Sequence, residues 1–89
     1  MSNFQATVTL VAGGTGGLGR AVALAFLRAE AKVHVTFRNQ AELDELYRAA
    51  EASAIQLQGH SVDVTDGNSV SQLVESILKK DGRLDVLPY

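Results

Sequence analysis

The residues of this chain that could do chemistry are five glycines crowded into seven positions. The run reads Gly13-Gly14-Thr15-Gly16-Gly17-Leu18-Gly19. Glycine adopts backbone angles that other residues avoid, and its missing side chain lets a ligand approach the main chain closely. A glycine turn that leads into a helix also presents unpaired N–H groups and the positive end of the helix dipole to an anion. The spacing therefore indicates a site for phosphate groups.

A strand before this run and a helix after it would position the glycines at the edge of a sheet. Residues 7–12 are apolar and β-branched, which is typical of a strand buried on both faces. Residues 18–30 favour a helix. This order is the context of a dinucleotide site, and no Lys-Ser or Lys-Thr pair follows to indicate a P-loop. The face of this helix predicted to be buried carries Leu18, Val22, Ala25 and Ala29.

The rest of the chain alternates strands with helices. Strands are predicted at 32–37, within 55–64 and at 84–87, and helices at 39–52 and 66–81. The whole chain, residues 1–89, then forms an α/β fold: a partial Rossmann, doubly wound β-α-β-α-β-α-β unit with parallel strands in the order 3-2-1-4. The apolar faces predicted for the last two helices are Leu43, Leu46, Tyr47 and Ala50, and Val70, Leu73, Val74, Ile77 and Leu78.

The composition limits the classes of function. The 89 residues are 46% hydrophobic, carry a net charge of −2 and include no cysteine. Nothing therefore suggests a nucleic-acid partner, an anionic membrane surface, a disulfide framework or thiolate chemistry. No apolar run approaches the roughly 18 residues of a membrane span, and no signal-like stretch precedes the first strand. We expect a cytoplasmic protein of one domain.

Four motifs in this order resemble the N-terminal half of a short-chain dehydrogenase/reductase. They are the glycine run preceded by Ala12, the pair Arg38-Asn39, the stretch Asp63-Val64-Thr65-Asp66, and residues 82–87. The family typically shows T-G-x3-G-I/L-G, an Arg or Asp after the second strand, D-V-T/S-D after the third, and G-x-I/L-D-x-L entering the fourth. The likeness covers nearly all of the chain.

The resemblance implies that a nicotinamide dinucleotide binds at the glycine run. The residues implied to line its pyrophosphate and adenosine ribose are Gly13, Thr15, Gly17, Leu18 and Gly19, with Leu18 acting mainly through its backbone N–H. Asp63 and Val64 would lie against the adenine, where the Asp63 carboxylate would accept from the exocyclic amine. The alternative for Asp63 is a turn residue ahead of the next helix.

Arg38 bears on which dinucleotide binds. Sites for NAD usually place a carboxylate at the end of the second strand, and here that end reads Thr36-Phe37-Arg38. Arg38 can instead pair with the 2′-phosphate of NADP, so we favour NADP(H) over NAD(H). A solvated surface arginine is the alternative, and Gly16 stands where many NADP-using relatives carry a second basic residue.

No catalytic residue and no metal site is predicted. The family's chemistry depends on a Ser and a Tyr-x3-Lys pair further along, whereas Tyr47 is followed four places on by Glu51 and Tyr89 ends the chain. His34 and His60 are expected to have separate structural roles. The acidic residues of the second helix are expected to form a solvated face: Glu42, Asp44, Glu45 and Glu51.

The leading hypothesis is the NADP(H)-binding portion of an oxidoreductase that interconverts a carbonyl and an alcohol by hydride transfer. We expect a chain truncated before the catalytic half, without turnover of its own. The alternative is a non-catalytic dinucleotide-sensing or interaction module, because the glycines also fit the G-x2-G-x2-G spacing of such relatives. An unpaired fourth strand would favour self-association as a homo-oligomer.

Overall fold

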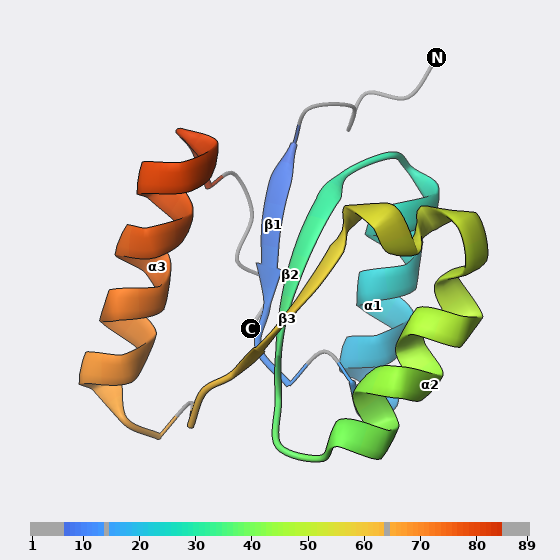
Figure 1. Ribbon diagram of the computed structural model, residues 1–89, viewed down its shortest axis with the longest axis horizontal. Helices are drawn as coiled ribbons and strands as arrows, with labels where there is room; N and C mark the ends of the chain where they lie inside the picture. Colours follow the sequence, from blue (N-terminus) through green and yellow to red (C-terminus); the bar gives the residue numbers. More distant parts are fainter. Residues whose placement is uncertain (1–6, 14, 64, 85–89) are drawn as a thin grey trace.

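Three parallel strands form one sheet with helices on both faces (Figure 1). The computed structural model describes residues 7–13, 15–63 and 65–84. Its elements are β1 (Val8–Val11), α1 (Gly17–Arg28), β2 (Lys32–Phe37), α2 (Gln40–Ala50), the 3₁₀ helix η1 (Glu51–Gln56), β3 (Leu57–Ser61) and α3 (Gly67–Asp81).

The sheet has β2 at its centre. The strand order is β1-β2-β3, with Val11 opposite Val35 and Val35 opposite Gly59. This order agrees with the 3-2-1 part of the prediction. The predicted fourth strand falls mainly on residues 85–87, outside the described residues, so its place beside β1 stays a prediction.

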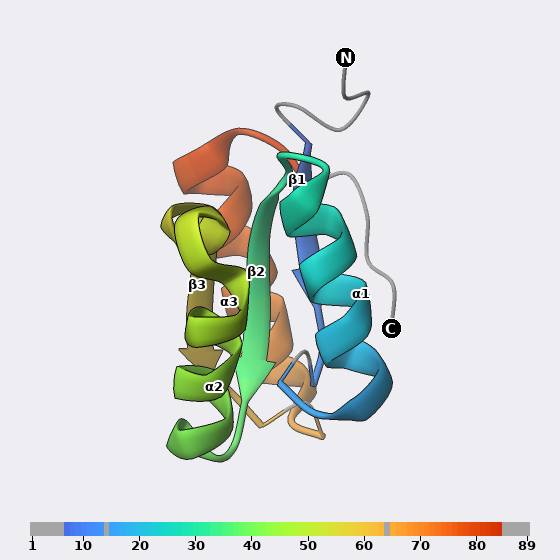
Figure 2. The ribbon, with the colours of Figure 1, turned by 90° about the vertical axis from the view of Figure 1, so that its right-hand side faces the viewer.

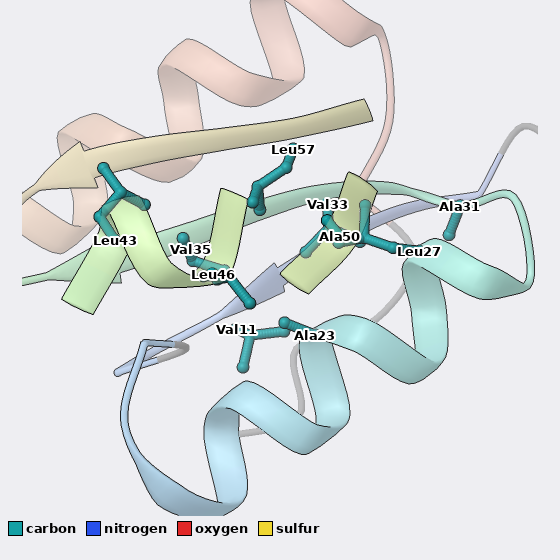
Figure 3. Close-up of a cluster of buried hydrophobic side chains, with 10 residues drawn as sticks. All are labelled: Val11, Ala23, Leu27, Ala31, Val33, Val35, Leu43, Leu46, Ala50 and Leu57. Atoms are coloured by element: carbon teal, nitrogen blue, oxygen red, sulfur yellow. The ribbon is translucent and has the colours of Figure 1, made fainter. Parts of the chain in front are cut away.

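The two faces of the sheet bury different cores. Helices α1 and α2 cover one face and α3 covers the other (Figures 1 and 2). The core under α3 is smaller and consists of Val8, Leu10, Leu73 and Ile77. Figure 3 shows the larger core, in which side chains from all three strands meet α1 and α2: Val11, Ala23, Leu27, Ala31, Val33, Val35, Leu43, Leu46, Ala50 and Leu57.

The buried face of α1 differs from the predicted one. Gly19, Ala23 and Leu27 are buried, whereas Leu18 is 66% exposed. The helix leaves its glycine turn at Gly17 and lays small residues on the sheet, which allows close helix–strand approach. Apolar periodicity does not reveal this face, because Leu27 is its only large apolar residue and its other two members are a glycine and an alanine. The prediction of Leu18, Val22, Ala25 and Ala29 as the buried face is therefore wrong, although Val22 is partly buried and packs against the core.

The other two helices pack largely as their patterns predict, except that Leu78 of α3, predicted on the buried face, is 45% exposed. Leu43, Leu46 and Ala50 of α2 are buried, and so are Leu73 and Ile77 of α3. Helix α2 ends two residues before the predicted position, where the chain tightens into η1.

The side chain of Leu43 in α2 occupies the space next to one position of β3. A Cβ placed on Gly59 would be 2.7 Å from Cδ2 of Leu43, so the Leu43 side chain would have to move to accept it. Leu43 itself is buried and fills this space. Glycine at position 59 therefore leaves room for the side chain of Leu43 against the sheet.

Candidate functional site

The glycine turn lies where the carboxyl ends of the strands meet the amino ends of the helices, at the bottom of Figure 1. Gly13 and Gly17 have φ angles of +66° and +47°, in the left-handed region that favours glycine. A Cβ placed on either residue would meet nothing within 4 Å. The turn is thus bordered by open space on the side from which a ligand could approach the backbone.

A threonine of the neighbouring strand holds this turn. The N–H of Gly13 donates to Oγ1 of Thr36, 2.7 Å away, and Thr36 is only 3% exposed. Within the turn, the N–H of Gly16 donates to the carbonyl of Gly13 at 3.3 Å. No sequence pattern singles out Thr36. The one indication in the sequence is that Thr36 carries a hydroxyl near the end of the second strand, two residues before Arg38.

A pocket of about 200 Å³ lies beside the turn. It brings together three of the predicted site residues: Gly13, Thr15 and Arg38. Thr15 is buried, whereas Arg38 is exposed at the end of β2. The remaining lining residues are Gly16, Thr36, Phe37, Glu42 and Val62.

The start of α1 differs from the starts of the other two helices. Oδ1 of Asn39 accepts from the N–H of Ala41 at 2.9 Å and caps α2, and Oδ1 of Asp66 accepts from the N–H of Asn68 at 3.0 Å and caps α3. The N-cap residue of α1 is Gly16, which has no side chain to play this part. The first N–H groups of α1 are therefore suited to an anionic ligand.

The other predicted residues of the glycine run lie in two different environments. Gly17 and Leu18 begin α1 and are exposed, while Gly19 is buried against the sheet. Gly19 therefore has a packing role that is visible in the structure. Val64 lies outside the described residues.

Asp63 follows β3 and forms a turn. Its Oδ1 accepts from the hydroxyl of Thr65 at 2.6 Å and from the N–H of Thr65 at 2.9 Å. These two hydrogen bonds, aided by the positive charge of Arg38, hold the pKa of Asp63 below its usual value. The structure therefore shows the turn role of Asp63, and contact with an adenine stays a prediction.

A polar cluster lies under α3, away from the glycine turn. Nδ1 of His34 is 2.8 Å from Nε2 of His60, and Nε2 of His34 is 2.8 Å from Oδ2 of Asp81. Lys32 donates to Oδ1 of Asp81 at 2.6 Å. The expectation of separate roles for the two histidines is wrong, because neighbouring strands place both of them on the face that α3 covers.

Burial has the largest effect on the pKa values of these two histidines. It lowers the pKa of His34 despite the opposing effect of Asp81, and it lowers the pKa of His60, which the neighbouring His34 lowers further. Burial would raise the pKa of Asp81, but hydrogen bonds from Lys32 and His34 outweigh it, so that pKa lies below its usual value. An ionised Asp81 accepts from Nε2–H of His34, which leaves Nδ1 of His34 to accept from His60.

Tyr47, the one tyrosine of the described residues, has a structural contact. The hydroxyl of Tyr47 donates to the carbonyl of Leu57 at 3.3 Å, which ties α2 to β3. Within residues 7–13, 15–63 and 65–84, no three His, Asp or Glu side chains are arranged to hold a metal ion. In the same residues, no helix has the length and apolar character needed to cross a membrane.

The chain is similar to known oxidoreductases over most of its length. The short chain dehydrogenase family matches residues 7–89. A short chain dehydrogenase/reductase of Macrophomina phaseolina, dpmpG, is 39% identical, over 97% of this chain and 50% of its own. The 3-oxoacyl-acyl-carrier-protein reductase FabG of Thermotoga maritima is 31% identical, over 93% of this chain and 34% of its own.

The fold is also similar to that of solved structures. The solved structure of ElxO with NADP bound superposes with a TM-score of 0.82 at 33% identity, over 91% of this chain and 33% of that one. The chain thus spans between a third and a half of the length of these relatives.

Proposed function

Because the chain belongs to the short-chain dehydrogenase family, we propose that the pocket beside its glycine turn binds the adenosine and pyrophosphate part of a nicotinamide dinucleotide. The observation that carries this proposal is the helix start at Gly16, which has no side-chain cap and stands next to open space at Gly13 and Gly17. The residues present fit an anionic ligand at this place.

The parts played by individual residues follow from their positions. Gly13 and Thr15 border the pocket, and the N–H groups of Gly17 and Leu18 stand at the start of α1, where they would bind the pyrophosphate. Gly19 would allow the helix to pack closely on the sheet. Asp63, together with Val64, would lie against the adenine.

We favour NADP(H) as the dinucleotide. Arg38 lines the pocket and is exposed, so its guanidinium can form a bidentate pair with a 2′-phosphate. The relative ElxO has NADP bound in its solved structure, which supports the same preference.

The reaction class proposed for the whole protein is the interconversion of a carbonyl and an alcohol, for which the bound dinucleotide supplies or accepts the hydride. The part of the protein described here would bind the dinucleotide and orient it. The one tyrosine of the described residues, Tyr47, already donates its hydroxyl to a backbone carbonyl, so we propose that these residues alone do not turn substrate over. Self-association and a cytoplasmic location stay predictions.

The first experiment is a calorimetric titration of the chain with NADPH and, separately, with NADH. We expect saturable binding that is tighter for NADPH. Arg38→Ala should weaken NADPH binding about tenfold, because it removes a solvent-exposed, charge-assisted pair that contributes about 1.5 kcal/mol. NADH binding should change much less.

The matched control is Arg48→Ala, which removes the same charge from the exposed last turn of α2. It should leave both affinities unchanged. Failure of the wild-type chain to bind either dinucleotide would contradict the proposed function. Equal losses in the two arginine variants would contradict the part assigned to Arg38.

A further inference from the structure

A carboxylate stands in the pocket that Arg38 lines. Glu42 and Arg38 both border this pocket, and a Cβ placed on Gly16 would lie 3.5 Å from Oε2 of Glu42. Glu42 is exposed, as the sequence predicts for the acids of α2, but its carboxylate lies against the glycine turn. An incoming ligand therefore meets one cation and one anion in the same pocket.

Glu42 differs in this respect from the acids beside it. Asp44 accepts from the side-chain amide of Gln40 at 3.0 Å, and Oε2 of Glu45 lies 3.8 Å from Nη1 of Arg20. Neither of these acids lines the pocket. Glu42 lies in the first turn of α2, where the helix dipole favours a negative charge. The fold thus supports an anion at position 42 and directs it towards the start of α1.

We propose that Glu42 is a specificity-determining residue of this pocket, which weakens the preference for a 2′-phosphate that Arg38 creates; the inference rests on the proposed function. A phosphate group carries between one and two negative charges at neutral pH, so Arg38 attracts it and Glu42 repels it. A 2′-hydroxyl can donate a hydrogen bond, and a carboxylate can accept it. The two side chains therefore act in opposite directions on the choice between NADP(H) and NAD(H).

The test uses two small probes that differ only at the ribose 2′ position: adenosine 2′,5′-bisphosphate and adenosine 5′-monophosphate. Glu42→Gln keeps the size of the side chain and removes its charge. We expect the ratio of the two affinities to shift about fivefold towards the bisphosphate in this variant, as for a solvent-screened charge pair, since any relief of the 5′-phosphate at the glycine turn is common to both probes. Glu42→Lys should shift the ratio further in the same direction.

Glu45→Gln is the matched control, because it removes one charge from the same helix outside the pocket. It should change neither affinity by more than about twofold. The salt dependence of the affinities distinguishes this electrostatic role of Glu42 from a purely structural one. The shift of the ratio in Glu42→Gln should shrink between about 0.05 M and about 0.5 M NaCl, because added ions screen the repulsion.

The outcomes separate this inference from the proposed function. A selective, salt-sensitive gain for the bisphosphate in Glu42→Gln supports the inference. Binding by the wild-type chain with an unchanged ratio in Glu42→Gln, or with an equal change in Glu45→Gln, overturns it and leaves the proposed function in place. No binding of either probe by the wild-type chain overturns both.

Discussion

At the scale of single residues, Thr36 connects the sheet to the glycine turn. Its hydroxyl accepts from the N–H of Gly13 in a buried position, so the hydrogen bond has little competition from water. Thr36→Val keeps the shape of the side chain and leaves that N–H without an acceptor. We expect the free energy of unfolding to fall by about 1–2 kcal/mol, measured by urea denaturation.

The same substitution should also weaken NADPH binding, because the turn that presents N–H groups to the pyrophosphate would no longer be fixed. Thr36→Ser is the control, since it keeps the hydroxyl. It should bind NADPH almost as tightly as wild type. If Thr36→Val matched wild type in both measurements, the hydrogen bond would have no energetic part in the site.

At the scale of the elements, the end of α1 contains a residue in an unfavourable conformation. Glu30 has a φ of +69°, and the N–H groups of Glu30 and Ala31 donate to the carbonyls of Leu27 and Phe26 at 3.0 Å. This is a Schellman motif, in which the left-handed position is usually glycine. Glu30→Gly should therefore raise the free energy of unfolding by about 1 kcal/mol.

Thermal and urea denaturation would measure this gain. Glu30→Ala separates the backbone effect from loss of the carboxylate, because alanine keeps the Cβ that is unfavourable at positive φ. We expect no comparable stabilisation from alanine. A gain of equal size in both variants would mean that the side chain, and not the backbone conformation, destabilises the wild type.

How well the elements could be predicted depended on the kind of residue that packs. Strand β2 has the predicted bounds, 32–37, because alternating β-branched residues mark it clearly. The face of α1 was predicted wrongly because Leu27 is its only large apolar residue, beside Gly19 and Ala23. In the site, local motifs identify Gly13, Thr15 and Arg38, whereas Thr36 and Glu42 line the pocket only because the fold brings them beside the glycine turn. Such long-range placement leaves no local pattern.

At the scale of the whole molecule, the cluster under α3 should make stability depend on pH. His34 and His60 have folded-state pKa values below the ordinary value of 6.5. Below about pH 6.5 the unfolded chain therefore binds more protons than the folded one, and the free energy of unfolding should fall with the pH. The slope should stay below about 1.4 kcal/mol per pH unit for each histidine.

Urea denaturation at several pH values between about 5 and 8 would measure this slope. His60→Gln is the informative variant, because its amide can still donate to Nδ1 of His34 and does not titrate. Its slope should be smaller than that of wild type. A free energy of unfolding that rises as the pH falls would show that Asp81 outweighs burial at His34.

The contact between α2 and β3 also constrains how this sequence can diverge. Because Leu43 occupies the place that a Cβ at position 59 would need, a side chain at 59 requires a change at Leu43 as well. A side chain gained at 59 is tolerable only where the residue at 43 has become smaller, and a larger residue at 43 would have to push the helix away from the sheet. A side chain at position 59 is therefore expected together with a smaller residue at position 43, sixteen residues away in the chain.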